Sequence, residues 1–484
     1  MQASILSQEQ RAIFAVDLDD TLIKTDLLFE RLLNLCLHSP ASLFLIPWYL
    51  CRGPLAFKKW LKSRVEINYE NLPYRKDVLD RVKSARQRGE KTILISASLQ
   101  EDVDRIASFL KVFDESVGSR DKNLKGISKV EYLEHKYPHA VKTYVGDSGS
   151  DISVWNRSQK AIVVNPGWWL RSEFSKTQIS PEIICDQKGL GSLIFKQLRV
   201  HQWSKNILVF IPVFLAHRFD EWTPWIRSTQ AFFAFSMMAS AVYVFNDLCD
   251  LNNDRLQESK KHRPLASGQL PLRVGFFLVP ICLLAAIAIL LSLPTETWIV
   301  FAAYLCMNGI YSFWVKEWLA IDVVFLSVFY TLRILAGGAA SQTWVSEWLL
   351  SFSVFFFFGL AMVKRYSELK KQSLMSLVSG TSRGRRAYEA QDLMTIMVMG
   401  ISTSIVSILV LALYLNSGEV QKLYQHPRIL WLVTPMLLFW LNRLWLLGAR
   451  GQVNEDPVIF AIKDKQTWFV AAAILGIIAE AIWG

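Results

Sequence analysis

The sequence predicts an N-terminal α/β domain built on a parallel sheet, followed by a C-terminal all-α domain that crosses a membrane about nine times. The chain has 484 residues, more than one globular domain usually contains. Charged residues occur throughout the first part, whereas beyond Lys205 long apolar stretches alternate with short polar links. A stretch of about 20 apolar residues is long enough to cross a bilayer. We therefore place a soluble domain at residues 1–190 and a membrane domain at residues 191–484.

Four short apolar runs in the soluble part are typical of buried β-strands. They cover residues 12–16, 91–96, 142–145 and 161–164, with helical patterns between them. Strands that alternate with helices form parallel sheets. Residues 27–89 interrupt the alternation as a helical insert, whose stretch 41–55 is apolar. That stretch is too short to span a bilayer, so it either lies on the membrane surface or packs in the domain's own core.

Nine apolar segments in the second part are candidate spans. They are residues 206–219, 228–247, 274–293, 297–315, 319–340, 346–363, 392–415, 429–447 and 467–483. Basic residues concentrate in alternate links, as in 260–263 and 364–386, and such links are cytoplasmic. The N-terminus shows no signal peptide pattern. We therefore predict a multi-pass protein of the cytoplasmic (inner) membrane, with the N-terminal domain in the cytoplasm and the C-terminus outside.

The net charge of +11 points to anionic partners. Much of this charge lies beside apolar spans, and no soluble stretch interleaves aromatic with basic residues, which argues against nucleic acid. We therefore expect the membrane and phosphorylated ligands as partners. The six cysteines form no CxxC pair or metal spacing and are expected to be reduced. The sequence leaves open whether the protein forms a homo-oligomer.

Polar side chains follow three of the predicted strands, at the edge where parallel sheets bind ligands. After the first strand, Asp17 is placed to attack a phosphorus atom and Asp19 to protonate the leaving oxygen. Ser96 ends the second strand and can donate a hydrogen bond to a phosphoryl oxygen. Asp147 and Asp151 follow the third strand. We expect these two carboxylates and the first two aspartates to hold Mg²⁺.

A lysine is expected to offset the charge on the phosphorus. Lys129 is the candidate, with Lys122 and Lys125 as nearby alternatives. This set of residues, in this order, resembles the haloacid dehalogenase-like (HAD-like) phosphatase superfamily, with the helical insert in the position of that family's cap. The resemblance implies that Asp17 forms a phosphoaspartate. The alternative is a phosphatase-like domain retained as a scaffold.

An aspartate box lies at the end of the span predicted at 228–247. Asn246 precedes three carboxylates, Asp247, Asp250 and Asp254, whose spacing would place them on one face of a helix. Such a face needs a cation, and Mg²⁺ binds carboxylates together with phosphate oxygens. The next link adds cations suited to a diphosphate: Arg255, Lys260, Lys261 and Arg263. An ordinary acidic helix end before a positive cytoplasmic link is the alternative.

Further polar residues lie at or near the predicted cytoplasmic ends of other spans. They are Lys205, Tyr311, Lys316, Asp322, Arg333, Lys364 and Arg365. Ionisable side chains at membrane depth are costly and usually functional. Single members such as Lys364 are also explained as snorkelling side chains. Together the set predicts a basic rim that binds phosphorylated ligands.

Four stretches resemble the UbiA prenyltransferase superfamily, and most closely its decaprenyl-phosphate phosphoribosyltransferase branch. They are LRVHQWSKN (198–206), NDLCDLNNDRLQESKKHRPLASG (246–268), YSFWVKEWLAIDV (311–323) and MVKRYSEL (362–369). The resemblance implies Mg²⁺-dependent transfer of 5-phosphoribose from 5-phosphoribosyl 1-diphosphate to a polyprenyl phosphate. The aspartate box would hold the metal. Lys316 and Asp322 would serve catalysis, with the lipid phosphate near Lys316 and Arg333.

The sequence departs from that branch at Gln257-Glu258, where His-Pro is common. Two alternatives therefore stay open: transfer of a prenyl group from a prenyl diphosphate to a small acceptor, or a non-catalytic lipid carrier with a regulatory HAD-like domain. The phosphoribosyl product would still carry a 5-phosphate. Removal of that phosphate would explain a fused phosphatase.

Overall fold

The computed structural model describes residues 12–484 except 175–179, 187–188, 380–387 and 454–455, and excludes the side chains at 316, 374–379 and 419. The chain forms two compact units. The first unit contains the chain up to Leu198 together with Tyr243–Pro280. The second unit contains Arg199–Val242 and Ile281–Gly484. The segment with the aspartate box therefore packs with the N-terminal residues, although it is distant from them in sequence.

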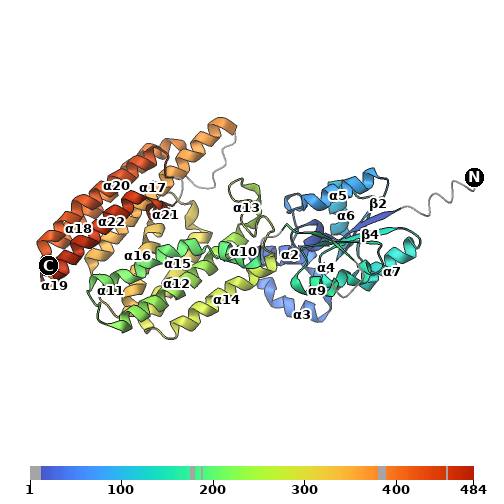
Figure 1. Cartoon of the computed structure of the whole chain (residues 1–484), viewed down its shortest axis with the longest axis horizontal. Coiled ribbons are helices and arrows are strands. Elements are labelled where there is room, and N and C mark those ends of the chain that lie inside the picture. Colours follow the sequence, from blue (N-terminus) through green and yellow to red (C-terminus); the bar gives the residue numbers. More distant parts are fainter. Residues whose placement is uncertain (1–11, 175–179, 187–188, 380–387, 454–455) are drawn as a thin grey trace, which may run out of the picture. The chain divides into compact units, whose positions relative to one another are not determined.

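The first unit is built on a six-stranded sheet with the order β3-β2-β1-β4-β5-β6. Strands β2 and β4 are labelled in Figure 1. Its strands are β1 (Ile13–Val16), β2 (Lys91–Leu99), β3 (Glu115–Ser119), β4 (Lys142–Gly146), β5 (Lys160–Val164) and β6 (Glu182–Ile184). All five pairings are parallel. The predicted α/β class is thus confirmed, and the four predicted strands correspond to β1, β2, β4 and β5. The short strands β3 and β6 were not predicted.

Helices cover both faces of this sheet. Phe14 and Val16 of β1 pack on the side of α5 (Lys76–Gln87) and α6 (Gln100–Leu110). The alternate residues, Ile13 and Ala15, pack on the side of α7 (Ile127–Lys136), α8 (Ile152–Trp155) and α9 (Trp168–Phe174). A strand buried on both faces reads as a continuous apolar run, which is why β1 was recognisable in the sequence.

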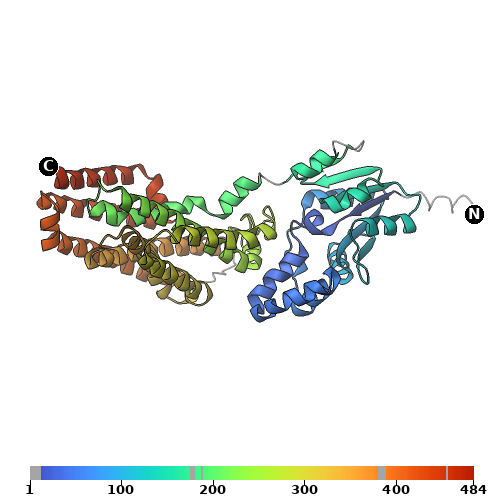
Figure 2. The same cartoon turned by 90° about the horizontal axis from the view of Figure 1, so that it is seen from below.

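The predicted insert is helical. It contains α2 (Leu27–His38), η2 (Pro40–Leu45), α3 (Ile46–Cys51), α4 (Pro54–Arg64) and η3 (Tyr69–Asn71), the blue helices of Figure 2. One face forms a small core in which Tyr49 stacks on buried Trp60, with 4.6 Å between the ring centroids. Phe44 and Trp48 are 88% and 60% exposed. The insert therefore has its own core and also presents apolar side chains outward.

The segment 243–280 completes the first unit. It contains the end of α12 (Trp222–Cys249), α13 (Leu251–Leu256) and the start of α14 (Leu272–Leu290). Leu248, Leu251 and Leu265 of this segment form one buried cluster with Leu33 of α2 and Leu193 of α10 (Leu190–Gln197). Apolar packing thus joins the aspartate-box segment to the insert helix α2.

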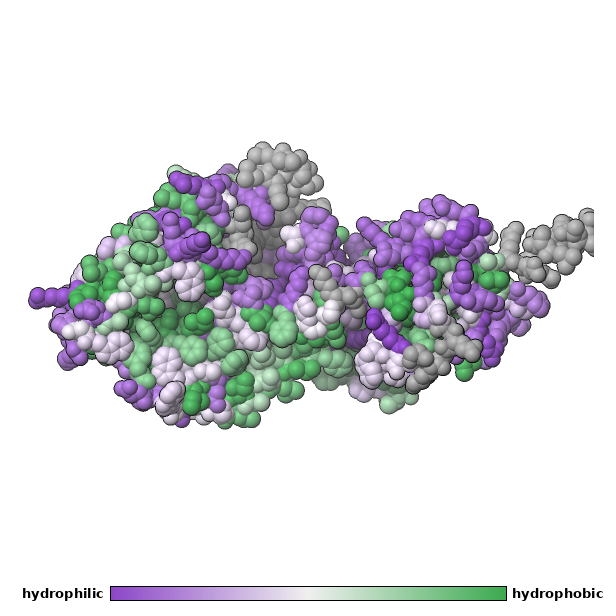
Figure 3. Space-filling view, in the orientation of Figure 1, coloured by the Kyte–Doolittle hydropathy of each residue, from purple (hydrophilic) through white to green (hydrophobic). Residues whose placement is uncertain are grey.

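Seven helices among the described residues are long and apolar enough to cross a membrane. They are α12, α14, α16 (Ile321–Ser341), α17 (Glu347–Ser379), α18 (Leu393–Leu415), α20 (Val433–Ala449) and α22 (Lys465–Trp483). Apolar residues, green in Figure 3, are exposed over much of the surface. Leu284 of α14 and Leu409 of α18 are examples of exposed apolar side chains on these helices. The protein is therefore a multi-pass membrane protein.

Two of the nine expected spans are not among these seven helices. The segment predicted at 297–315 is helical as α15 (Thr295–Phe313), but Glu296 and Asn308 make it less apolar. The segment predicted at 206–219 is divided into a 3₁₀ helix, η5 (Val200–Phe210), and the short α11 (Ile211–Leu215). Here η5 lies directly against α16, because a Cβ at Gly337 would come 1.9 Å from the Val209 carbonyl oxygen.

Candidate functional site

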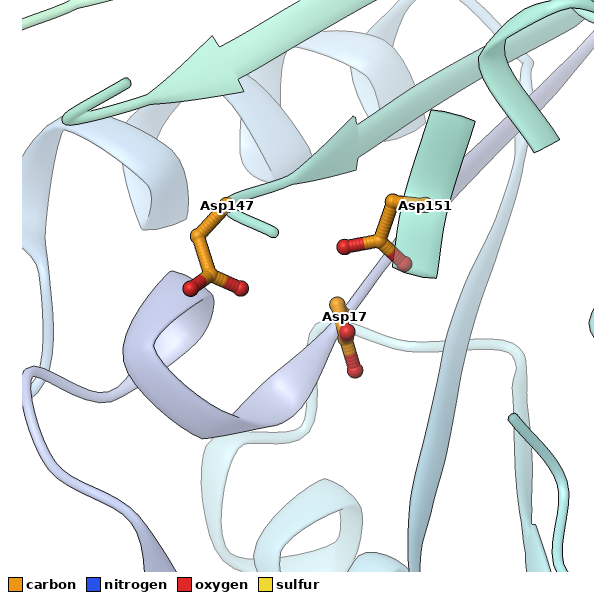
Figure 4. Close-up of side chains that lie close together, drawn as sticks. All are labelled: Asp17, Asp147 and Asp151. Carbon is orange, nitrogen blue, oxygen red and sulfur yellow. The ribbon is translucent and has the colours of Figure 1, made fainter. Parts of the chain in front are cut away.

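The predicted phosphatase residues meet at the carboxyl edge of the sheet. Asp17 follows β1, and Asp147 and Asp151 follow β4; their side chains converge, with a carboxylate oxygen from each within 4.8 Å of the others (Figure 4). Lys129 of α7 is buried beside them, with Nζ 2.6 Å from Asp17 Oδ2 and 3.2 Å from Asp151 Oδ1. Neither Lys122 nor Lys125, the alternatives from the sequence, is buried.

Burial and mutual repulsion disfavour charge on these carboxylates. Burial raises the pKa of Asp17 to about 7, against the opposing charge of Lys129. Burial, followed by the charges of Asp17 and Asp151, raises the pKa of Asp147 well above its ordinary value. Three oxygen ligands at this separation are the donor set that Mg²⁺ accepts. The cluster can therefore hold a divalent cation.

Asp19 lies apart from the carboxylate cluster, although it was predicted as a fourth metal ligand. Its Oδ2 accepts hydrogen bonds from Ser98 at 2.5 Å and Ser96 at 3.4 Å. Its Oδ1 accepts from the backbone N–H of Leu27 at 3.0 Å, at the start of α2. Burial, with the charge of Asp26, raises the pKa of Asp19 to about 6. A carboxyl group that binds protons near neutrality is suited to act as a general acid.

Three contacts in this site were not predicted. Ser98 lies two residues beyond Ser96 on β2. Because side chains two positions apart on a strand point to the same face, this spacing could have indicated Ser98 in the sequence. The Tyr144 hydroxyl donates to Asp151 at 2.8 Å and accepts from Lys129 at 2.8 Å. Thr21 donates to Asp147 at 3.1 Å. No local pattern distinguishes Tyr144 from an ordinary core tyrosine.

The aspartate box does not lie on one continuous helix. Helix α12 ends at Cys249 and α13 begins at Leu251, so Asp250 lies in the break between them. Arg263 joins the other two carboxylates, with Nη1 2.9 Å from Asp247 Oδ1 and 2.6 Å from Asp254 Oδ2. Asp247 and Asp254 thus face the same guanidinium although they belong to two successive helices, and Asp250 lies between them.

Other predicted residues surround the box. Lys260 Nζ lies 3.5 Å from Asp254, and Asn246 is half-buried on α12. Gln197, which was not predicted, donates from α10 to Asp247 at 2.9 Å. Arg255 is directed elsewhere: its two Nη atoms lie 3.2 and 2.5 Å from the carboxylate of Glu30 on α2. The Arg255 guanidinium thus binds the insert, within the first unit.

Two groups of polar residues are buried in the second unit. In the first, Asp322 of α16 accepts from Arg365 Nε of α17 at 2.7 Å and from the Tyr388 hydroxyl at 2.8 Å. The Tyr311 hydroxyl lies 3.4 Å from Arg365 Nη2. Lys316 lies in η6 (Val315–Glu317), and its side chain is outside the described part of the structure.

The second group centres on Asp456, which was not predicted. Lys205 Nζ lies 2.6 Å from its Oδ2, and Lys364 Nζ lies 3.5 Å from the same atom. Burial alone would raise the pKa of Asp456, but these two lysines lower it to about 2. Asn206, the residue after Lys205, accepts a hydrogen bond from Arg333 Nε at 2.8 Å. Lys205 and Lys364 are thus paired with one carboxylate within the second unit. That carboxylate, Asp456, lies more than 90 positions from either lysine in the sequence.

Several known proteins are similar to parts of this chain. A protein called y4nM from Sinorhizobium fredii is 34% identical over 95% of this chain and 89% of its own length. The decaprenyl-phosphate phosphoribosyltransferase of Mycolicibacterium smegmatis is 25% identical over 61% of this chain and 94% of its own length. A HAD family hydrolase from Salmonella enterica superposes with a TM-score of 0.28 and 15% identity, covering 37% of this chain and 69% of that one.

The sequence profile of the UbiA prenyltransferase family matches residues 207–456. That range includes the aspartate box, the group around Asp322 and, from the second group, Arg333, Lys364 and Asp456. The parallel sheet and its strand-end carboxylates agree with the resemblance of the first unit to HAD-like phosphatases. The chain belongs to the UbiA prenyltransferase family.

Proposed function

We propose that the protein transfers 5-phosphoribose from 5-phosphoribosyl 1-diphosphate to a polyprenyl phosphate and then removes the 5-phosphate from the lipid product. The observation that carries this proposal is that a full set of phosphatase side chains and the aspartate box belong to one compact unit. The Mycolicibacterium relative, a decaprenyl-phosphate phosphoribosyltransferase, supports the choice of donor and acceptor.

In the transfer step, Asp247, Asp250 and Asp254 would hold Mg²⁺, which neutralises charge on the diphosphate. Asn246, Lys260 and Arg263 add hydrogen bonds and positive charge around the leaving group. A phosphate oxygen of the lipid forms a bond to C1 of the sugar as the bond from C1 to the diphosphate breaks. The lipid phosphate is already ionised, so its attack needs no general base.

The basic and hydroxyl groups that would bind and orient the lipid phosphate are Lys205, Tyr311, Lys316, Arg333, Lys364 and Arg365. Asp322 holds Arg365 in place through the 2.7 Å hydrogen bond. Asp456 likewise holds Lys205 and Lys364 in place through ion pairs.

In the hydrolysis step, Asp17 attacks the phosphorus of the 5-phosphate and forms a phosphoaspartate. Asp19 gives its proton to the departing ribose oxygen and then accepts a proton from the water that cleaves the phosphoaspartate. Ser96 and Lys129 bind the phosphoryl oxygens. Asp147 and Asp151, with Asp17, would hold Mg²⁺ there.

Lipid analysis of the Asp17→Asn variant tests this sequence of steps. Purified protein is incubated with both substrates, and the lipids are analysed by mass spectrometry. We expect the variant to accumulate polyprenyl-phosphoribose 5-phosphate and wild-type protein to release polyprenyl-phosphoribose. An Asp247→Asn control should form neither lipid. Equal phosphorylation of the wild-type and Asp17→Asn products would refute the hydrolysis step.

The family match favours a second candidate, transfer of a prenyl group to a small acceptor. Purified protein offered radiolabelled prenyl diphosphate or 5-phosphoribosyl 1-diphosphate separately distinguishes the two. Labelled lipid formed only with the prenyl donor would replace the phosphoribosyl proposal.

A further inference from the structure

The insert of the first unit carries an apolar patch on its outer side. Four large apolar side chains are exposed in η2 and α3: Phe44, Leu45, Trp48 and Leu50. We call these four residues the insert patch. The residues between them pack inward on the small core of the insert; these are Leu43, Ile46 and Tyr49. A helical segment that is apolar on all sides is normally buried on all sides. Within the described part of the first unit, only its inner side is covered.

The insert packs against the start of a membrane-spanning helix. The ring of Phe29 on α2 lies 5.9 Å from that of Phe276 on α14, measured between centroids. Leu37, in the last turn of α2, belongs to the same apolar cluster as Leu278. At 1.5 Å per residue, Phe276 lies about 6 Å along α14 from its first residue, Leu272. Helix α2, which leads directly into η2, is therefore packed at the level where α14 enters the bilayer.

The stretch that contains the insert patch is basic. Residues 31–65 include six Lys or Arg residues and no Asp or Glu. Three of these cations contact protein groups of the first unit: Arg31, Lys58 and Lys62. The other three are exposed, and none forms an ion pair with a described residue: Arg52, Lys59 and Arg64. Positive charge without a carboxylate partner thus accompanies the apolar patch.

Arg52 connects the charge with the patch. Its guanidinium carbon lies 4.9 Å from the ring centroid of Trp48 and 5.7 Å from that of Tyr49. Trp and Tyr are enriched where lipid headgroups meet acyl chains, and arginine keeps its charged end among the headgroups there. Anionic lipids also attract basic residues at the surface. The combination therefore fits the surface of an anionic bilayer.

A second copy of the chain is a poorer partner for this patch. A symmetric dimer places the same patch of both copies face to face. Arg52 and Lys59 of each copy would then approach the same cations of the other copy, and like charges repel. A bilayer that contains anionic lipid supplies the opposite charge instead.

We propose that the insert patch enters the surface layer of a bilayer that contains anionic phospholipids, and that Arg52, Lys59 and Arg64 bind the lipid headgroups. The bilayer is the one that α14 crosses. Helices that lie on membranes enter about 5–10 Å into the boundary between headgroups and acyl chains. Cys51, next to Arg52, stays at the level of the headgroups, where water-soluble reagents reach it.

The insert also contacts the phosphatase-like site. Lys58 Nζ of α4 donates to the carbonyl oxygen of Ala97 at 2.7 Å, between Ser96 and Ser98 of β2. An insert fixed on the bilayer therefore holds this site close to the lipids of the same leaflet. The proposal depends on the membrane and on none of the proposed substrates.

Fluorescence quenching by lipid tests the proposal. A bimane probe is attached at Phe44→Cys in an otherwise cysteine-free full-length chain. The chain is reconstituted into vesicles of phosphatidylcholine and phosphatidylglycerol, in which some lipids carry a nitroxide near the start of an acyl chain. The control probe is at Ile127→Cys, because Ile127 is also apolar and exposed, at 67% against 88% for Phe44, but lies outside the insert. We expect at least about threefold stronger quenching at position 44.

The role of charge is tested with Arg52→Gln and Lys59→Gln combined in the chain labelled at position 44. The ratio of bound to unbound insert should fall by about fivefold for each cation removed. Quenching should fall similarly for the unchanged cations in vesicles of phosphatidylcholine alone. Lys160→Gln, at an exposed lysine on β5, is the matched control and should leave quenching unaltered.

Equal quenching at positions 44 and 127 in folded protein would overturn the proposal. A probe at position 44 that is shielded from aqueous iodide but not quenched by nitroxide lipid would also overturn it, because protein would then cover the patch. Quenching that is independent of the two cations and of phosphatidylglycerol would overturn the binding of anionic headgroups.

Thermal unfolding of each labelled chain checks that it is folded. If the cysteine-free chain does not fold, a fluorescent amino acid is incorporated at position 44 or 127 of the otherwise natural chain, and the same difference in quenching is expected. No substrate is present in these measurements. Failure of the proposed transfer or hydrolysis would therefore leave their outcome unaffected.

Discussion

At the scale of single residues, Lys129 is the central cation of the phosphatase-like site. It contacts Asp17, Asp151 and the Tyr144 hydroxyl, all within 3.2 Å. We predict that Lys129→Met lowers phosphatase kcat by at least about 100-fold, because a fixed cation beside the phosphorus is removed. Steady-state hydrolysis of p-nitrophenyl phosphate measures the change. Lys125→Met, at an exposed lysine nearby in sequence, is the matched control. Equal effects of the two changes would contradict the role of Lys129.

Glu115 gives a pH-dependent prediction outside the proposed sites. Burial would raise its pKa, but hydrogen bonds from Lys136, Tyr132 and Tyr137 lower it to about 2. A depressed carboxyl pKa stabilises the fold above the unfolded value of about 4.3, and this stabilisation is lost as the pH falls towards 2.

We therefore expect Glu115→Gln to lower the Tm at pH 7 by about 2–4 °C, and by about half as much at pH 3, which lies between the two pKa values. Tryptophan fluorescence during thermal unfolding of the full chain measures both differences. A Tm difference that is the same at the two pH values would show that the carboxylate charge does not contribute.

Residues that follow predicted strands were the ones that the sequence identified. Asp17 and Asp147 come directly at strand ends, so a local pattern places them at one edge of the sheet. Ser96, which was predicted to end its strand, lies inside β2 instead. Gln197 and Asp456 contact predicted residues from 50 and 251 positions away. Such partners are brought together only by tertiary packing, and no spacing rule reveals them.

At the scale of elements, α2 connects the insert to both candidate sites. Its first residue, Leu27, donates to Asp19, its Glu30 binds Arg255, and its Leu33 packs in the apolar cluster with Leu248. A helix with three such contacts is fixed in position relative to the aspartate-box segment of the first unit. The sequence predicted the helix but not these contacts, which join residues up to 225 positions apart.

We predict that Glu30→Gln destabilises the first unit by about 3–5 kcal/mol, because Arg255 would remain buried without its charged partner. Combining it with Arg255→Met should recover part of that loss. Urea denaturation of the full chain, followed by tryptophan fluorescence, gives the free energies of unfolding. Glu101→Gln breaks the pair with Lys62, in which Glu101 is 76% exposed, and serves as the surface control. Similar costs for both pairs would contradict the structural role of α2.

Strands and spans differ in how well the sequence indicated them. β1 and β5 are apolar runs buried on both faces, whereas β3 reads Glu-Ser-Val-Gly-Ser and β6 has three residues. Pairing with neighbours, more than local preference, makes those two segments strands. Likewise, η5 contains Lys205 and Asn206, whose polar partners keep this segment folded without a long apolar helix.

At the scale of the whole molecule, the orientation proposed for the membrane gives a labelling prediction. Cys51 and Cys185 are exposed in the first unit. With this unit in the cytoplasm, a membrane-impermeant maleimide should label them in inside-out vesicles and leave them unlabelled in intact spheroplasts. Each is tested as the single cysteine of an otherwise cysteine-free chain. Ser292→Cys in that background lies in the link between α14 and α15, which contains no Lys or Arg and is therefore expected to face outward; it should show the opposite pattern. Labelling of Cys51 in intact spheroplasts would reverse the orientation.

The interleaving of the two units constrains the order in which the protein is made. Residues up to Ile184 provide all six strands, but Tyr243–Pro280 emerges from the ribosome only after most of α12. Until then, Glu30 has no Arg255 to neutralise it, and Leu33 has no cover from Leu248. The soluble-looking N-terminal part therefore completes its packing only after the first long apolar helix has been synthesised. Biogenesis of the phosphatase-like part is in this sense tied to membrane insertion of the transferase.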